Sequence, residues 1–245
     1  MEVQVQYELE SSMTDDTALK GQLTDLLRSR GFTVNEIPRS DHPTADFVVN
    51  DDVDSYVVEL KLRENLPLQQ DPLTVRVAAG GRTNRASGIL RAAADQLAEP
   101  PVGSALRVVW VLAPEPDREL RYRQFESTAY GILIAAGPGI LRQCYYATHA
   151  DFHRFQASLD GMALGTFGAL LLNDLSGGYA RLRDSKLTRL FGTAVRDPVA
   201  LEAAGEIITV RGDVDRTDKA AVVEYLNRVH GLPVAELTQL SHFSV

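Results

Sequence analysis

The chain has 245 residues, of which 44% are hydrophobic and 24% charged, a composition typical of a globular protein with a sizeable core. Its net charge of −8 argues against a surface coated for nucleic acid, and its longest apolar stretches, 130–136 and 162–172, are shorter than the ~20 residues of a membrane-spanning helix. Cys144 is the only cysteine and the first residues are polar, so we expect a cytoplasmic protein without a disulfide, a signal peptide or a membrane partner.

The first part of the chain predicts a helix followed by three strands. Leucines recur at helical spacing in residues 14–30, and Gly31 is suited to end that helix. Three stretches with the apolar pattern of strands follow, at residues 32–37, 46–49 and 56–62. The polar turn between the last two predicts a hairpin, and residues 64–82, rich in Pro, Gln and Gly, indicate a loop.

Helices and strands alternate in the next part. A helix is expected at residues 86–98, and the nearly continuous apolar run at 106–112 is typical of a buried strand. Further elements are expected at residues 119–128 (helix), 131–135 and 144–148 (strands). This order predicts an α/β core with a mixed sheet flanked by helices.

The pattern is less regular beyond about residue 155, although a strand at 207–210 and a helix at 217–230 are expected. We therefore predict a core domain at residues 1–135 and a C-terminal α/β extension at residues 136–245. The role of that extension is not defined by any motif.

Positive charge is concentrated in two segments despite the acidic total. Residues 61–91 carry six positive side chains against two negative ones, and residues 181–196 carry five against one. Almost all are arginines, which suit bidentate phosphate contacts. A genomic preference for arginine codons would explain the same composition, so both interpretations stay open.

Three charged side chains stand on two predicted strands that are otherwise apolar. Asp46 opens one strand, and Glu59 and Lys61 lie near the end of the other. Because side chains two positions apart on a strand share a face, Glu59 and Lys61 lie side by side. Buried charges need to pair or to hold a metal, and two carboxylates on adjacent strands suit Mg²⁺ or Mn²⁺. A lysine beside them could orient a metal-bound water.

These residues and the order of elements around them resemble the PD-(D/E)xK nuclease superfamily, the restriction-endonuclease-like group. In that family a helix ending in Gly precedes a strand, an Asp starts a second strand, and Glu-x-Lys lies on a third, before a helix and a buried strand. The chain matches this order over roughly residues 14–135, with Asp46 thirteen residues before Glu59. The resemblance implies a restriction-endonuclease-like fold.

The resemblance also implies an activity. Asp46, Glu59 and the Leu60 carbonyl would ligate Mg²⁺ or Mn²⁺, and Lys61 would position or activate the attacking water. The implied reaction is phosphodiester hydrolysis, with DNA as the expected substrate, in defence or repair. Two features depart from the family pattern: Pro43 is three residues before Asp46, and Lys20 and Gln22 stand where many members have a metal-binding Glu. The second departure puts two-metal catalysis in doubt.

The second predicted helix offers further candidates for contact with nucleic acid, because backbone amides at a helix N-terminus favour phosphate. These candidates are Arg82, Arg85 and Arg91 at or near that N-terminus, and Gln96 deep in the helix, where the resemblance implies a Gln near the active site in some branches of the superfamily. A helix with a solvated polar face is an equally good interpretation of the same residues.

Two alternatives remain open at this point. The chain could keep the nuclease fold without cutting and bind nucleic acid or another protein, as a monomer or a homodimer. Alternatively, its function could reside in residues 150–245, which a separate cleft lined by His149 and His153 would favour. Two histidines alone make a poor zinc site, because no third ligand is evident.

Overall fold

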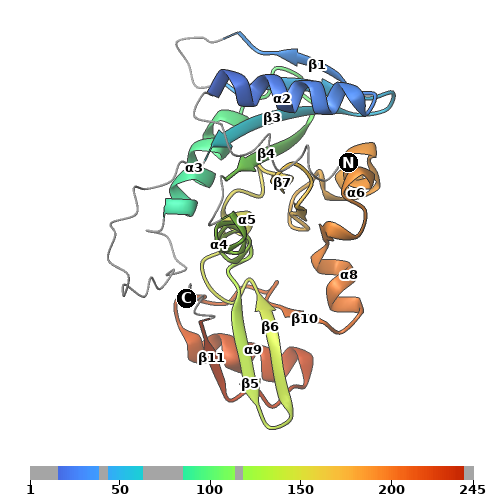
Figure 1. Ribbon diagram of the computed structural model, residues 1–245. Coiled ribbons are helices and arrows are strands. Elements are labelled where there is room, and N and C mark those ends of the chain that lie inside the picture. Colours follow the sequence, from blue (N-terminus) through green and yellow to red (C-terminus); the bar gives the residue numbers. More distant parts are fainter. Residues whose placement is uncertain (1–15, 39–43, 63–84, 114–117, 240–245) are drawn as a thin grey trace, which may run out of the picture.

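The structure is a computed structural model and describes residues 16–38, 44–62, 85–113 and 118–239. The predicted loop at residues 64–82 lies outside the described residues, as does Arg82. The described chain forms two sheets and the helices around them (Figure 1).

The larger sheet has seven strands. They are β1 (Thr33–Glu36), β2 (Phe47–Asn50), β3 (Ser55–Leu62), β4 (Leu106–Leu112), β7 (Gly161–Leu164), β8 (Ala169–Leu172) and β9 (Val195–Arg196), in that spatial order. β1, β2 and β3 are antiparallel neighbours, β3, β4 and β7 run parallel, β8 is antiparallel to β7, and β9 is parallel to β8. The predicted α/β class with a mixed sheet is therefore confirmed, and so is the hairpin of β2 and β3.

The smaller sheet has four strands in the order β10 (Ile207–Thr209), β6 (Ile140–Tyr145), β5 (Leu133–Gly137) and β11 (Glu236–Thr238). The helices are α2 (Asp16–Ser29), α3 (Arg85–Leu97), α4 (Arg118–Tyr130), α5 (Asp151–Arg154), α6 (Tyr179–Asp184), α7 (Lys186–Phe191), α8 (Pro198–Ala203) and α9 (Lys219–His230), with a short 3₁₀ turn, η1 (Gly192–Ala194). The strand predicted at residues 144–148 begins and ends earlier, as β6, because the chain turns at Tyr146, whose φ is +60°.

α2 is held on the larger sheet by leucines that recur every fourth residue. Leu19, Leu23 and Leu27 are buried, because side chains at this spacing share one helical face. Gly31 ends the helix with a φ of +77°, a conformation that costs glycine least. The N–H groups of Gly31 and Phe32 then donate to carbonyls of the last turn, which closes the helix.

The two central strands, β3 and β4, are buried on both faces, as parallel strands between helical layers are. Their side chains alternate between two hydrophobic clusters: Val58 and Trp110 contribute to the cluster under α2, whereas Val57 and Val109 contribute to the cluster under α3 and α4. Figure 1 shows α2 on one side of this sheet and α3 and α4 on the other. The helices thus flank the sheet in two layers.

The smaller sheet shares its core with one face of the larger one. Cys144 of β6 and Val222 of α9 belong to the same cluster of buried side chains as Val109 of β4. The division predicted at residue 135 stays a prediction, but the hydrogen bonding of the larger sheet crosses it, because β7 pairs with β4. In the described parts of the chain, no helix is long and apolar enough to cross a membrane.

Arg107 and Asp160 form an ion pair at the start of β4 and β7. Asp160 is only 1% exposed and accepts hydrogen bonds from Arg107, from the backbone N–H at 2.8 Å and from the guanidinium at 3.1 Å. We predict that Asp160→Ala lowers the free energy of unfolding by roughly 3–5 kcal/mol, because the Arg107 cation loses its partner. Urea denaturation measures this change.

The exposed pair of Arg183 and Asp184 provides the control for that measurement. Asp184→Ala should leave the urea midpoint unchanged, because exposed ion pairs contribute little. Equal effects of the two substitutions would contradict the structural role of Asp160.

Candidate functional site

The Asp46 carboxylate is held against β3 by the backbone. Asp46 lies just before β2, where its N–H donates to the Val58 carbonyl at 3.1 Å. Its Oδ2 accepts the Leu60 N–H at 2.9 Å. In an antiparallel pair the N–H and C=O of one residue face the same neighbour, so the Leu60 carbonyl also lies on the Asp46 side of β3. Asp46 and Leu60 therefore meet at one edge of the β2–β3 hairpin.

Glu59 is a buried carboxylate that is only half satisfied. It is 2% exposed, and its Oε1 accepts a hydrogen bond from Lys61 at 2.6 Å. Its Oε2 is buried and has no hydrogen-bond partner among the residues that the structure describes. Burial raises the pKa of Glu59 to about 7; the Lys61 ammonium opposes this rise, and the nearby Asp46 carboxylate adds to it.

Lys61 links β3 to α3. Its ammonium donates to Glu59 and to the side-chain carbonyl of Gln96, and the Gln96 amide donates to the Thr44 carbonyl at 3.2 Å. Glu59, Lys61 and Gln96 thus lie on the α3 face of the sheet. A residue near the end of α3 orients the lysine that the sequence analysis had singled out.

The Lys20 side chain of α2 forms an ion pair with Oδ1 of Asp46. The resemblance placed Lys20 where many nucleases carry a carboxylate, and its ammonium now contacts the predicted metal ligand. Each of the two carboxylates consequently has a lysine partner, Lys20 for Asp46 and Lys61 for Glu59. The charges of these four side chains balance when both carboxylates are ionised.

The donor set still fits one divalent cation. Asp46, Glu59 and the Leu60 carbonyl offer oxygen ligands, which Mg²⁺ and Mn²⁺ prefer, and Mg²⁺ needs only one or two carboxylates because it keeps several waters. Among the described residues the buried Oε2 of Glu59 has no hydrogen-bond partner, and a bound cation would give it a positive partner. Among the described residues, no group of three or more His, Cys, Asp or Glu side chains is placed to hold a metal ion.

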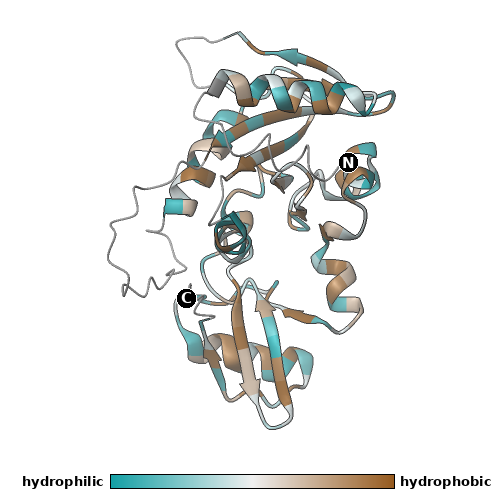
Figure 2. Ribbon diagram, viewed as in Figure 1, coloured by the Kyte–Doolittle hydropathy of each residue, from teal (hydrophilic) through white to brown (hydrophobic). Residues whose placement is uncertain are grey.

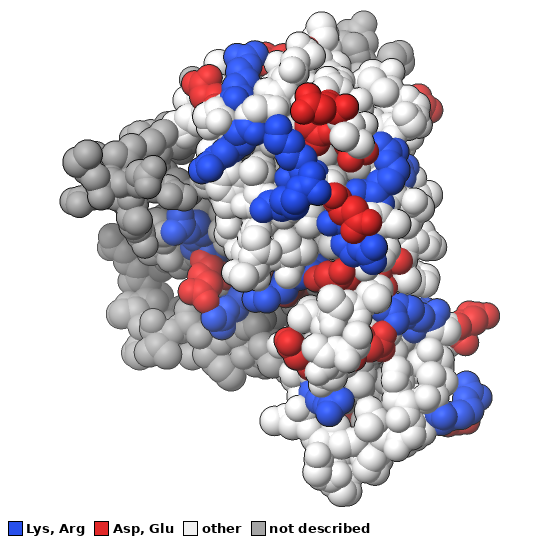
Figure 3. Space-filling model, turned by 90° about the vertical axis from the view of Figure 1, so that its right-hand side faces the viewer, with Lys and Arg blue, Asp and Glu red and all other residues white. Residues whose placement is uncertain are grey.

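The other residues predicted to contact nucleic acid are not all exposed on α3. Arg85 and Arg91 lie exposed on α3, whereas Gln96 points to Lys61. Cations of the second basic segment mostly have partners: Arg181 pairs with Asp54 at 2.8 Å, and the Lys186 ammonium donates to the Gly31 carbonyl. Figure 3 shows blue and red groups mixed over the face that it presents, rather than a continuous basic surface.

A separate cavity is lined by His149 and His153, the feature that would favour a function in the C-terminal part. It has a volume of about 300 Å³, and Arg154, Asp151 and Arg216 also line it. The two histidines do not share a helical face, because α5 begins only at Asp151.

Comparison of the chain with protein-family models, with curated proteins and with solved structures finds no match. The resemblance to PD-(D/E)xK nucleases therefore depends on the order of the elements and on Asp46, Glu59 and Lys61 themselves.

Asp151 makes stability depend on pH. It is 4% exposed, and within the described parts of the chain its buried Oδ2 has no hydrogen-bond partner. Burial raises the pKa of Asp151 to about 6 from 3.8, although a hydrogen bond with Ser87 opposes the rise. The folded protein therefore binds this proton more tightly than the unfolded chain. The stabilisation is fully present below pH 3.8 and is lost as the pH rises through 6.

We predict that Asp151→Asn is more stable than the wild type at pH 8, by on the order of 2 kcal/mol, because the amide cannot ionise. The advantage should disappear near pH 4. Urea denaturation of both proteins at pH 4, 6 and 8 measures the difference, with Asp52→Asn at an exposed turn as the control. A difference that is independent of pH would contradict the assignment.

Proposed function

We propose that this chain is a metal-dependent nuclease of the PD-(D/E)xK type that hydrolyses phosphodiester bonds, with DNA as its substrate. The observation that carries the proposal is the meeting of Asp46, Glu59 and Lys61 at one edge of the sheet, at the end of β3. The order α2, β1, β2, β3, α3, β4 supports a restriction-endonuclease-like core around these residues.

The residues divide the chemistry between them. Asp46, Glu59 and the Leu60 carbonyl would bind Mg²⁺ or Mn²⁺, which when bound would polarise a phosphoryl oxygen and lower the pKa of a coordinated water. Lys61 would orient that water and offset the negative charge that develops on the phosphorus centre. Gln96 accepts a hydrogen bond from Lys61 and so fixes the direction of its ammonium.

A second candidate function is binding of nucleic acid without cleavage. The observation that favours it is the pairing of both carboxylates with lysines, which balances their charge without a cation. In that case Lys20 would replace the metal as the positive neighbour of Asp46. The two functions differ in whether a divalent ion displaces Lys20 from Asp46.

Cleavage assays test the first function. Purified protein with Mn²⁺ is incubated with single-stranded and double-stranded DNA and RNA, and cleavage is expected for at least one of them. Lys61→Ala and Asp46→Ala should each lower the rate by roughly 10²–10⁴-fold, the usual effect of losing a group that handles the reacting proton or its water.

Lys219→Ala is the matched control, because this lysine donates to the Leu237 carbonyl beside the smaller sheet. It should cut as fast as the wild type. Folded wild-type protein that cuts none of the four substrates would exclude the nuclease function and leave the binding function.

Metal affinity tests the role of Lys20. Lys20→Gln should bind Mn²⁺ roughly tenfold more tightly than the wild type, because the ammonium no longer competes with the cation for Asp46. Glu59→Gln should bind it more weakly. Isothermal titration calorimetry measures both affinities, and unchanged values for both variants would show that the cation does not bind here.

A further inference from the structure

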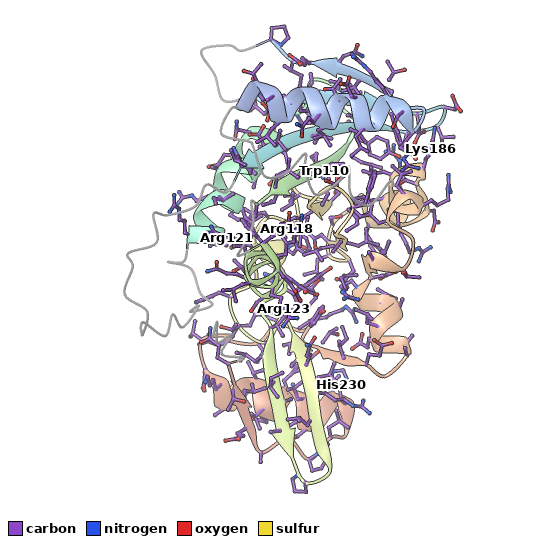
Figure 4. All side chains as sticks on the ribbon, viewed as in Figure 1. Trp110, Arg118, Arg121, Arg123, Lys186 and His230 are labelled. Carbon is purple, nitrogen blue, oxygen red and sulfur yellow. The ribbon has the colours of Figure 1, made fainter. Side chains whose placement is uncertain are left out.

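α4 is a polar helix in a central position. Figure 2 shows it mostly in the hydrophilic colour although it lies between the two sheets. Its buried side chains all lie in the last two turns: Phe125, Thr128, Ala129 and Tyr130. Its first turns carry Arg118 and Arg123, both labelled in Figure 4. A polar helix surface in the middle of a molecule requires water or a polar ligand beside it.

A cavity of about 510 Å³ lies on this polar side of α4. Three arginines, an aromatic ring and a short turn line it: Arg118, Arg123, Arg196, Tyr122 and the turn at residues 164–169, together with Glu119 and Glu126. The volume is within the range of ligand sites. Arginine side chains bind phosphates and aromatic rings stack against bases, so sites for single-stranded nucleic acids combine the two kinds of residue.

The turn between β7 and β8 is held rigidly. The Trp110 indole N–H donates to the Gly165 carbonyl at 2.7 Å, and the Gly165 N–H donates to the Val111 carbonyl at 2.8 Å. Gly165 has a φ of +66°, and a Cβ there would come within 2.9 Å of the Tyr122 hydroxyl oxygen. The wall of the cavity is therefore formed in advance and depends on a glycine.

The cavity lies on the same edge and the same face of the larger sheet as the candidate catalytic residues. Lys61 is in register with Val111 of β4, and Val111 with Leu164 of β7, which lines the cavity. Two strand spacings separate Lys61 from Leu164, about 10 Å. This distance is short enough for one strand of nucleic acid to contact both places. Ligands of such sheets bind outside the carboxyl ends of parallel strands.

We propose that the cavity between α4, the β7–β8 turn and β9 binds the phosphates of a single-stranded nucleic acid segment a few nucleotides from the bond to be cut. This inference deepens the proposed function, since it concerns how the substrate of that reaction is held. Arg118, Arg123 and Arg196 contact the phosphates, and a base lies against Tyr122.

The two glutamates keep the cavity nearly neutral before the ligand binds. Arg123 pairs with Glu119 at 2.5 Å, and Arg196 lies 3.6 Å from Glu126. Arg123 and Glu119 are largely solvent-exposed, and exposed pairs contribute little, so a phosphate can replace Glu119 as the partner of Arg123. At 3.6 Å the contact of Arg196 with the mostly buried Glu126 is longer than a hydrogen bond, so Arg196 can also turn to a phosphate. This arrangement reconciles an acidic protein with a nucleic-acid site.

Filter binding in EDTA with a labelled 12-nucleotide single strand tests the proposal, because no cleavage interferes without metal. Arg118→Ala, Arg123→Ala and Arg196→Ala should each weaken binding roughly three- to tenfold and lower the salt dependence by about 0.7 per lost contact. Glu119→Gln should bind more tightly than the wild type. Arg228→Ala, an exposed arginine on α9, is the control and should bind as the wild type does.

The outcomes separate this inference from the proposed function. Loss of binding in the three arginine variants but not in Arg228→Ala supports the cavity, even if no preparation cuts nucleic acid. Unchanged binding in all three variants overturns the cavity, even if the wild type cuts. Equal competition by polyglutamate, or tighter binding of a duplex than of the single strand, would also overturn it. Thermal unfolding of each variant confirms that it is folded.

Discussion

The parallel pairing of β3, β4 and β7 is the constraint on which the rest of the structure depends. These strands are buried on both faces, so their register cannot slip without exposing the core side chains of both clusters. Because they run parallel, their carboxyl ends reach the same edge of the sheet. Glu59 and Lys61 arrive at that edge on β3, and the turn that follows β7 arrives there as the wall of the α4 cavity.

The buried carboxylate at this edge of the sheet lowers the stability of the fold. A carboxylate on a central strand is costly to bury, and the raised pKa of Glu59 is the measure of that cost. Lys61 offsets part of it, and Gln96 fixes the position of Lys61. A purely structural strand would carry an apolar residue at this position. Asp151 is a second buried carboxylate with an unpartnered oxygen among the described residues, but Glu59 is the one that lies beside a lysine and another carboxylate at the carboxyl ends of parallel strands.

The elements up to β4 could be predicted from the sequence because their signals are local: leucines every fourth residue in α2, the apolar run of β4, and the glycine that ends α2. The sequence does not predict the β7–β8 pair, because an apolar run with interspersed glycines has no period that distinguishes strands from a buried helix. Its position beside β4 is a long-range pairing, which no local pattern encodes.

The sequence likewise predicts only part of the candidate site. Asp46, Glu59 and Lys61 carry a spacing that can be recognised, whereas the contact of Gln96 with Lys61 joins residues 35 positions apart and depends on how α3 crosses the sheet. The arginines of the α4 cavity come from a helix and from the last strand of the sheet, and only Arg196 belongs to a basic segment that the sequence distinguishes. Tertiary packing, not sequence spacing, brings them together.

Trp110 is the only tryptophan of the chain, and it lies fully buried at the centre of the larger sheet. Its indole N–H binds the Gly165 carbonyl, directly beneath the turn that lines the α4 cavity. The tryptophan emission of the protein therefore comes from one site of known surroundings. A shift to longer wavelength would report water reaching the sheet, and a change in intensity without a shift would report movement of this turn, with no label attached.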